Sequence, residues 1–320
     1  MYGYETFHEE LMQNLINSVH SGLSSHAYIF EGKEGLGVRN AARLFAAALT
    51  CQNKEIAPCG ECPLCKESKA DTNPDIVYVN SGDKKSIGAE KMRALEEDVA
   101  IKPFAAERKV YIIEDGALLT EAAQNVFLKT FEEPPEYAVF IIVIENSSHL
   151  LDTVLSRFTL IHFPCVSDAK VEGYIKSKYP DETERLEFLV KYCAGIPGEA
   201  DKVMENAEFE NLRQASLEKF SALLSQDKKS AFTISKFAEE NKDDFAKILD
   251  FWLSFSRDII LLQTDADERI INIDKKDELR GFSSQINPER TVKLFDKIVK
   301  TQKMLSRYVN IKATAMWLAL

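Results

Sequence analysis

Short apolar runs alternate with longer amphipathic stretches through the first half of the chain. Apolar runs of four to seven residues between turn-forming residues are typical of buried strands, and apolar residues repeating every three or four positions are typical of helices. This alternation predicts a parallel sheet covered by helices. Five strands are expected, at 27–30, 76–79, 110–113, 138–144 and 160–163. Helices are expected between them, at 38–50, 89–101, 118–131 and 149–156.

Strand signals disappear from residue 167 onward, where helical segments are separated by turn-forming residues. The pattern predicts an α/β domain over 1–166, a small helical domain over 167–207 and an all-helical domain over 208–320. The separating turns are at 195–198, 225–227 and 281–288.

Composition narrows the class of protein. The 320 residues have room for two or three domains, and an apolar fraction of 45% is ordinary for a protein with substantial cores. A net charge of −11 argues against a broad non-specific DNA-binding surface, so the direct partners are expected to be proteins. Residues 1–6 lack the features of a secretory signal, and no apolar run is long enough to span a bilayer. We therefore expect a cytoplasmic protein without membrane contact.

The segment Gly32–Arg39 has the frame of a phosphate-binding P-loop, G-x-x-x-x-G-K-[ST], with both chemically active positions changed. Val38 stands where the motif has its phosphate-binding lysine, and Arg39 where it has the hydroxyl that coordinates Mg²⁺. Valine carries no charge, and arginine has no acceptor atom for a metal. We therefore expect a P-loop descendant that does not hydrolyse nucleotide. The defining positions of the degenerate loop are Gly32, Gly35, Gly37, Val38 and Arg39.

Four of the six cysteines fall within fifteen residues, separated by residues that form tight turns. In a reducing compartment, four closely spaced thiolates match a closed tetrahedral zinc site with a structural role. A [4Fe–4S] cluster, which also uses four cysteines, and free thiols are the alternatives. Cys165 and Cys193 are isolated and are expected to be ordinary buried thiols. The four ligands would be Cys51, Cys59, Cys62 and Cys65.

Polar residues follow three of the expected elements. Glu114 and Asp115 end an apolar strand, in the reverse of the order that an ATPase of this type would use. Glu145 and Asn146 follow the next strand, where a polar residue would sense a γ-phosphate. Arg157 comes at the end of an expected helix, where an arginine can act on a neighbouring subunit's phosphates, although a surface arginine or helix cap is the simpler interpretation.

Together these motifs resemble the delta-prime clamp-loader subunits of bacterial DNA polymerase III, members of the AAA+ superfamily. The resemblance covers residues from about 7 to 165, and the helical remainder agrees in length and class. Its residues are His26–Phe30, the degenerate loop, the four cysteines, Val110–Asp115, Leu128–Pro134 and Ser156–Phe158.

The resemblance implies a five-stranded AAA+ (P-loop NTPase-like) domain with a zinc module at 51–65, a helical lid at 167–207 and an all-α collar at 208–320. It implies a non-hydrolysing subunit in which Arg157 serves as an arginine finger in trans. Gly198 stands where active relatives have a sensor arginine, which agrees with lost hydrolysis. Phe158 departs from the cysteine that the family commonly has at that position.

The implied partners are the tau/gamma and delta subunits, with the β sliding clamp and primer-template DNA reached through the complex. The protein would then be an accessory subunit of a DNA-directed DNA polymerase, a nucleotidyltransferase, without enzymatic activity of its own. Apolar and aromatic residues near the end of the chain would pack in the collar or in the domain's own core. They include Tyr308, Val309, Ile311 and Trp317.

Two other functions compete with this interpretation. An ATP-hydrolysing tau/gamma-type subunit shares the fold, but Val38 argues against it. A stand-alone zinc protein that binds nucleic acid would need a basic surface near the cysteines. The acidic balance of the chain weakens that alternative, and few basic residues flank the module. They are Lys54, Lys66 and Lys69.

Overall fold

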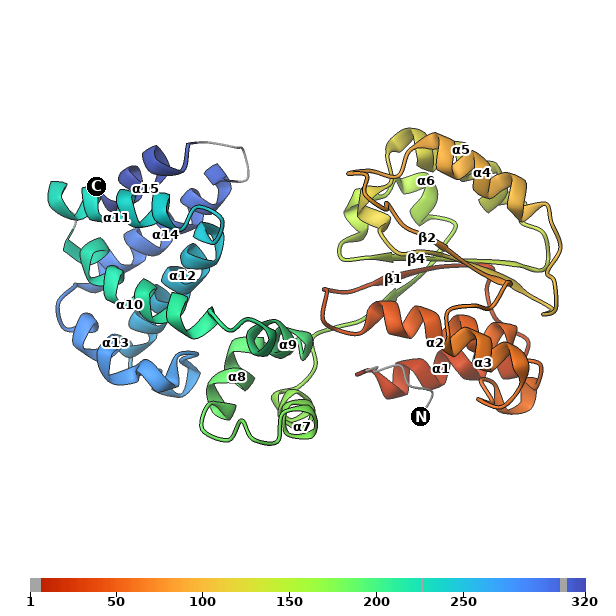
Figure 1. Cartoon of the computed structure of the whole chain (residues 1–320), viewed down its shortest axis with the longest axis horizontal. Coiled ribbons are helices and arrows are strands. Elements are labelled where there is room, and N and C mark those ends of the chain that lie inside the picture. The colour runs from red at the N-terminus through yellow and green to blue at the C-terminus, as the bar shows by residue number, and fades with distance from the viewer. Residues whose placement is uncertain (1–6, 226, 306–309) are drawn as a thin grey trace. The chain divides into compact units, whose positions relative to one another are not determined.

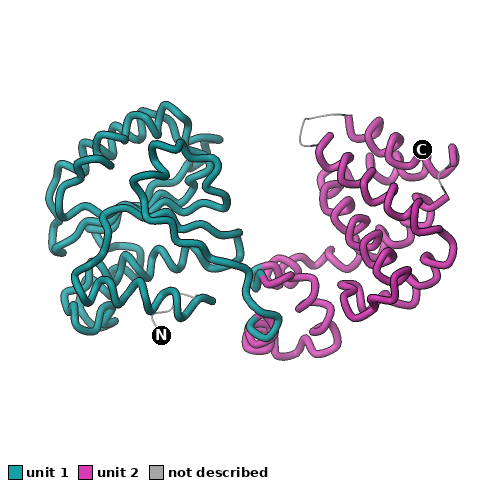
Figure 2. The backbone as a smooth tube through the Cα atoms, turned by 180° about the vertical axis from the view of Figure 1, so that it is seen from behind, with its two compact units in different colours: residues 1–170, 196–198 teal, residues 171–195, 199–320 magenta. Residues whose placement is uncertain are grey.

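The computed structural model describes residues 7–225, 227–305 and 310–320. The chain forms two compact units (Figure 2): unit 1 comprises residues 1–170 and 196–198, and unit 2 comprises 171–195 and 199–320. Among the described residues, no helix has the length and apolar character needed to cross a membrane. Tyr308 and Val309, which were expected to pack near the end of the chain, lie outside the described residues.

Unit 1 contains the predicted five-stranded parallel sheet, with the strand order β2-β3-β4-β1-β5. β1 therefore lies between β4 and β5, and the register pairs Ile29 with Ile142 and with Leu160. All residues of β4 are buried, as expected for a central strand that is covered on both faces. The strands are β1 (Ala27–Glu31), β2 (Ile76–Val79), β3 (Lys109–Ile113), β4 (Ala138–Ile144) and β5 (Thr159–His162).

Helices cover both faces of this sheet (Figure 1). Tyr28 and Phe30 of β1 belong to the apolar layer beneath α1 and α2, while Ala27 and Ile29 belong to the layer beneath α4, α5 and α6. The sequence analysis missed α1 and also α3, which is only seven residues long and lies within the cysteine module. The helices are α1 (Glu9–His20), α2 (Val38–Thr50), α3 (Pro63–Lys69), α4 (Ala89–Val99), α5 (Glu121–Glu132) and α6 (Asp152–Leu155).

The parallel sheet gives unit 1 two chemically different edges. Because the strands run in one direction, all their carboxyl ends meet at one edge and all their amino ends at the other. The degenerate loop follows β1 and lies at the carboxyl edge. Arg157 directly precedes β5, and residues 101–108 directly precede β3, so both lie at the amino edge.

The described residues of unit 2 form helices joined by turns and no strand, which confirms the predicted class. Trp252 is fully buried, and its indole N–H donates to the Ser216 carbonyl at 2.9 Å. Trp317 is partly exposed, with the Lys297 ammonium 5.3 Å from its ring centre, and Ile311 is half-buried. The helices are α7 (Asp168–Lys178), α8 (Leu186–Cys193), α9 (Gly198–Glu205), α10 (Phe209–Ser225), α11 (Lys228–Glu240), α12 (Phe245–Leu262), α13 (Lys276–Ser283), α14 (Pro288–Leu305) and α15 (Ile311–Ala319). Short 3₁₀ turns occur at Lys54–Ile56, Gly116–Leu118, Ser147–His149, Asp267–Arg269 and Ile273–Lys275.

Candidate functional site

The degenerate loop has the strand–loop–helix geometry that its sequence predicts. Gly35 and Gly37 adopt φ values of +90° and +73°, in the left-handed region that favours glycine. Gly37 is the N-cap of α2 and offers no capping side chain. These two glycines allow the sharp turn that leads from β1 into α2.

Val38 points into the core and not toward a nucleotide. It is buried in the apolar layer beneath α2. A Cβ on Gly32 would lie 2.9 Å from the Val38 methyl group and 2.9 Å from Phe163, so the three residues are closely packed. The position that carries the phosphate-binding lysine in the intact motif is an apolar packing position here.

Gly198 packs directly on the loop. Its backbone N–H donates to the Gly35 carbonyl at 3.0 Å, and a Cβ on Gly198 would lie 2.5 Å from the Gly35 Cα atom. Backbone atoms approach this closely only when both residues are glycine. Any side chain at Gly198, including an arginine, would collide with the loop.

Arg39 and Asp115 form an ion pair across the carboxyl edge. The Arg39 guanidinium lies 3.0 Å from the Asp115 carboxylate. The second oxygen of Asp115 accepts hydrogen bonds from the Ser81 N–H at 3.0 Å and the Ser81 hydroxyl at 3.2 Å. A metal ion at this carboxylate would have to displace the arginine, because both would occupy the same acceptor.

Arg43 forms an ion pair with Glu114, the acid that precedes Asp115 in the chain. The sequence analysis missed this interaction. The Arg43 guanidinium lies 3.1 Å from Glu114 and 3.0 Å from Asp71, and it packs 5.1 Å from the Tyr78 ring centre. Arg43 follows Arg39 by four positions on α2, so the two side chains share one helix face. That spacing was the signal that could have linked both arginines to the two acids.

Two further carboxylates bond to the chain's own backbone. Glu145 accepts the Glu34 N–H at 3.2 Å, which places its carboxylate at the loop. Glu31 accepts the Ser147 N–H at 2.7 Å, and this bond is the main cause of a pKa below the ordinary value for Glu31. The four acids at or near the carboxyl edge thus have partners within the chain.

A pocket of about 480 Å³ lies beside the end of β5, formed by residues 7–11, 14, 162, 164–167 and 170. None of the loop residues 32–39 lines it. Cys165 lines this pocket and is exposed, so the expectation of a buried thiol was wrong there. Cys193 is buried as predicted, and burial raises the pKa of its thiol to about 12.

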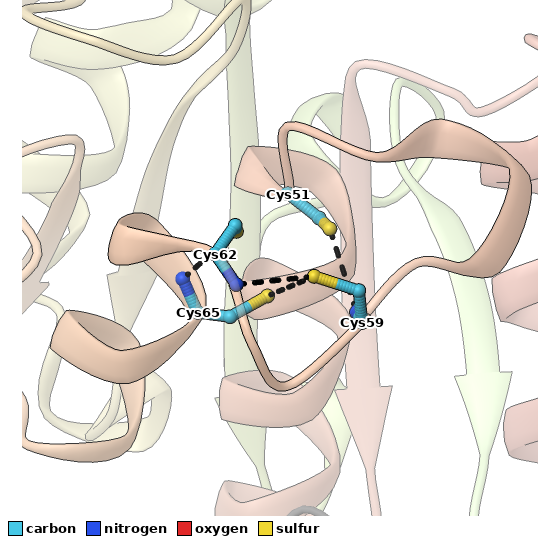
Figure 3. A group of neighbouring side chains, drawn as sticks. All are labelled: Cys51, Cys59, Cys62 and Cys65. Carbon is cyan, nitrogen blue, oxygen red and sulfur yellow. Dashed lines mark hydrogen bonds between the residues drawn. The ribbon is translucent and has the colours of Figure 1, made fainter.

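The four clustered cysteines converge on one point at the amino edge, where α2 ends (Figure 3). The Sγ atoms of Cys59 and Cys65 are 3.9 Å apart, and the four sulfur atoms lie within 4.8 Å of one another. A tetrahedral zinc ion with Zn–S bonds of about 2.3 Å separates its sulfurs by ~3.8 Å. The four thiols therefore fit a metal ion with small adjustments.

Backbone N–H groups point at three of these sulfurs. Cys59 N–H bonds to Cys51 Sγ at 3.5 Å, Cys62 N–H to Cys59 Sγ at 3.4 Å, and Cys65 N–H to Cys62 Sγ at 3.4 Å. The bond from Cys62 is the main cause that lowers the pKa of Cys59 to about 6, while burial raises the pKa of Cys51. Such donors stabilise thiolates, the form that binds metal.

Arg157 lies between α6 and β5. The next residue, Phe158, anchors this part of the backbone in the core. Phe158 is buried, and its ring centre is 4.6 Å from that of Phe131 on α5. The guanidinium donates to the Thr153 carbonyl at 2.6 Å and forms an ion pair with Glu132 at the end of α5. The Arg157 side chain is 32% exposed and Glu132 47% exposed, so the pair faces solvent.

Comparison with known proteins finds relatives along nearly the whole chain. DNA polymerase III subunit delta' of Bacillus subtilis is 27% identical over 308 residues, covering 94% of this chain and 92% of that protein. DNA polymerase III subunit tau of the same organism is 28% identical over 92% of this chain, which spans 56% of tau. A crystal structure of a gamma subunit-related protein from Thermotoga maritima aligns over 97% of both chains, at 17% identity and a TM-score of 0.46.

Two family models match most of the chain. The model of the DNA polymerase III delta subunit matches residues 7–167, and the model of the C-terminal part of that subunit matches residues 207–317. The expected resemblance to delta-prime subunits is confirmed by the match to the Bacillus protein. The chain belongs to the DNA polymerase III delta subunit family.

Proposed function

We propose that this chain is a non-hydrolysing subunit of the DNA polymerase III clamp loader. In this role it supports ATP-dependent loading of the β sliding clamp onto primed DNA and supplies an arginine to a neighbouring ATPase subunit. Membership of the delta subunit family and the similarity to delta' over 94% of the chain support the general role. The contacts at the two edges of the sheet support the more specific role, that of a subunit that does not hydrolyse ATP and supplies an arginine to its neighbour.

The ion pair between Arg39 and Asp115 is the observation that carries the non-hydrolysing role. In an active P-loop ATPase the corresponding hydroxyl and acid hold Mg²⁺ beside the phosphates. Here the Arg39 guanidinium is bonded to the Asp115 carboxylate, and Val38 is buried away from the loop surface. Without a metal position and a phosphate-binding lysine, the loop lacks the charges that stabilise phosphoryl transfer. These contacts argue equally against the alternative of a tau/gamma-type ATPase.

The position of Arg157 supports action in trans. Arg157 precedes β5 at the amino edge, while the degenerate loop follows β1 at the carboxyl edge. An arginine at the opposite end of the sheet from its own loop is placed to meet a second molecule. Its surface ion pair with Glu132 is worth at most about 1 kcal/mol, so a phosphate can displace the carboxylate at little cost.

The four-cysteine module is proposed to hold one structural zinc. Four protein ligands leave no open position for water or substrate, which excludes catalysis at such a metal. Zinc fits better than iron–sulfur because the sulfur spacing matches a single small ion. The metal would fix residues 51–65 as an insert between α2 and β2.

The partners follow from the proposed assembly. They are the tau/gamma and delta subunits, with the β clamp and primer-template DNA bound by the complex as a whole. Residues 167–207 would form the lid and 208–320 the collar that joins the subunits. Since bacterial chromosomes are replicated in the cytoplasm, the proposal also places the protein there.

The test is to reconstitute the loader with the wild-type chain, with Arg157→Ala or with Arg157→Lys, and to measure ATP hydrolysis stimulated by clamp and primed DNA. Known arginine fingers are worth about 10³ to 10⁵ in rate, and a ring with several sites will show a smaller total loss. Lysine should rescue poorly because it lacks the planar fork. Arg185→Ala is the matched control, since Arg185 has a side-chain exposure of 34% and a carboxylate partner, Glu182.

Arg157→Ala should leave thermal unfolding and assembly unchanged while hydrolysis and clamp loading fall together. Arg185→Ala should change neither rate. Full hydrolysis and loading by a correctly assembled Arg157→Ala complex would refute the finger role. Hydrolysis by the isolated wild-type chain, abolished by a Gly37 substitution, would refute the non-hydrolysing role.

A further inference from the structure

Helix α6 is the short element that carries Arg157, and its position depends on its surroundings. It spans only Asp152–Leu155, and the Arg157 guanidinium donates to the Thr153 carbonyl within it at 2.6 Å. The place of the guanidinium therefore follows that of the helix. An isolated helix of this length is unstable in water, because few hydrogen bonds repay the cost of ordering its first turn. The contacts at the two ends of α6 thus decide where Arg157 lies.

Gln124 of α5 holds the beginning of α6. Its side chain is buried, and its carbonyl oxygen accepts the backbone N–H of Leu151, the N-cap of α6, at 2.8 Å. Its amide nitrogen donates to the carbonyls of Leu119 and His149, each at 3.3 Å. Buried polar groups of this kind are held firmly when donor and acceptor are both satisfied. One side chain thus ties the first turn of α5 to the backbone that leads into α6.

The last turn of α5 holds the other end of α6. The ring centre of Phe158 lies 4.6 Å from that of Phe131, in an edge-to-face arrangement, and Arg157 pairs with Glu132. Phe131 and Glu132 follow Gln124 by seven and eight positions, which is about two helical turns. Helix α5 therefore holds the segment that contains α6 at two points, one near each of its own ends.

We infer that Gln124 is a positioning residue for Arg157. Its hydrogen bonds fix where α6 begins, and thereby the direction in which the guanidinium reaches the nucleotide of the neighbouring subunit. This inference rests on the proposed function. Because Gln124 is buried, it acts through the place of α6 and not on the nucleotide itself. A misplacement of about 1 Å can cost on the order of 10²-fold in rate, so a remote hydrogen bond can control a reaction.

The surroundings of Gln124 distinguish this role from general support of the core. Its neighbours Ala123 and Phe127 on α5 are buried in the apolar layer beneath that helix. An apolar side chain of similar length would fill the same space, and burying a polar amide there is costly unless it is bonded. What only the amide provides is the set of bonds to the backbone at His149 and Leu151, in the segment that carries Arg157.

The experiment compares loaders reconstituted with the full-length chain as wild type, Gln124→Met, Arg157→Ala or the double variant. The measured quantity is the Arg157-dependent rate, defined as stimulated ATP hydrolysis minus that of the Arg157→Ala loader. Gln124→Met keeps the length of the side chain and loses its hydrogen bonds, and it should reduce this rate by roughly tenfold or more. The loss should appear in kcat with the KM for ATP unchanged, because Arg157 acts on the transition state.

A role in stability alone would give a different pattern. Thermal unfolding and sedimentation of the loader measure the folded and assembled fractions, to which the rates are normalised. Gln124→Met should cause no further loss in the Arg157→Ala background, because the two residues act as a unit. Gln263→Met is the matched control in unit 2. Gln263 is half-buried, and its amide also donates to two backbone carbonyls, those of Ser283 at 3.2 Å and Ile286 at 2.7 Å.

Gln124→Glu is the milder variant and provides the same test if Gln124→Met does not assemble. Burial favours the protonated carboxyl, which has one donor and one acceptor and can keep the bond from the Leu151 N–H. The Gln124→Glu loader should therefore show a smaller loss in kcat than the Gln124→Met loader, again with the KM for ATP unchanged.

Three results would overturn the inference and leave the proposed function standing. They are an unchanged Arg157-dependent rate in the Gln124 variants, an equal loss in Gln263→Met, and a further fall in the double variant. The last would show that Gln124 acts independently of Arg157. Full hydrolysis by an assembled Arg157→Ala loader would overturn the finger role and, with it, this inference.

Discussion

The two edges of the unit 1 sheet have opposite chemical character. At the carboxyl edge, Arg39 and Arg43 neutralise Asp115 and Glu114 within the chain, and Gly198 packs on the loop. At the amino edge, Arg157 and Phe104 face solvent on backbones that buried groups hold in place.

Under the proposed function, the difference is that between a nucleotide site whose acids are paired within the chain and a surface that acts on the neighbouring subunit. Ion pairs at the carboxyl edge take the place of a metal ion beside Asp115 and Glu114, because the arginines supply the positive charge internally. Arg157, by contrast, pairs with Glu132, a half-exposed carboxylate that a phosphate can displace. The comparison predicts that substitutions at the amino edge change the activity of the assembled loader. It also predicts that restoring the consensus P-loop residues at the carboxyl edge does not restore ATP hydrolysis.

The largest effect is expected at the cysteine module. Cys62→Ser removes one of four ligands and should destabilise unit 1 by roughly 3–5 kcal/mol, because structural zinc binding is coupled to folding. Metal analysis of the wild-type chain should give one zinc per molecule, and urea unfolding should measure the loss in the variant. Cys165→Ser, at an exposed thiol outside the cluster, is the control and should change neither quantity.

Iron with visible charge-transfer absorption, or no metal in protein purified without chelators, would contradict the zinc assignment. Equal stability of Cys62→Ser and the wild type would show that the cysteine module does not stabilise unit 1.

A smaller effect is expected from rebuilding the P-loop. Val38→Lys with Arg39→Thr restores both consensus residues, yet ATP turnover should stay at background. The new lysine would replace a buried valine and should cost about 1–3 kcal/mol of stability, since an ammonium is poorly solvated there. Gly198 would still offer no cation to a γ-phosphate.

Steady-state ATP hydrolysis tests the expected lack of turnover, and thermal unfolding tests the expected loss of stability. Val38→Ala serves as the control for lost packing, since it removes apolar volume without adding charge. Measurable turnover by the rebuilt chain would mean that the residues at positions 38 and 39 alone had silenced the site.

The smallest effect is expected from Glu132→Gln, which weakens the pair that holds Arg157. Stability should change by no more than about 1 kcal/mol, because the pair is exposed to solvent. Stimulated hydrolysis by the reconstituted loader should be equal to or slightly above that of the wild type, since Arg157 no longer has to leave a carboxylate. Glu133→Gln is the neighbouring control. A loss as large as that of Arg157→Ala would show that Glu132 positions the arginine in the working complex.

Sequence patterns predicted most of the helices and strands, apart from α1 and α3, and the chemistry of residues that are close in the chain. The five strands, the helix after the loop and the helical second half follow from apolar periodicity, which is a local property. The cysteine cluster could also be predicted from the sequence, because Cys59, Cys62 and Cys65 follow one another at intervals of three residues. The seven-residue α3 was missed because it is too short for a helical period to stand out.

Sequence alone thus determined the strands, the loss of lysine and hydroxyl from the loop, and the four thiols, since each depends on residues that are close in the chain. Only the tertiary structure decided that Arg39 meets Asp115, 76 positions away, and that Gly198 rests on Gly35. It also decided that Asp75 holds the backbone of Phe104. The physical reason is the strand order, because pairing β1 with β4 and β3 with β2 selects which distant residues share an edge.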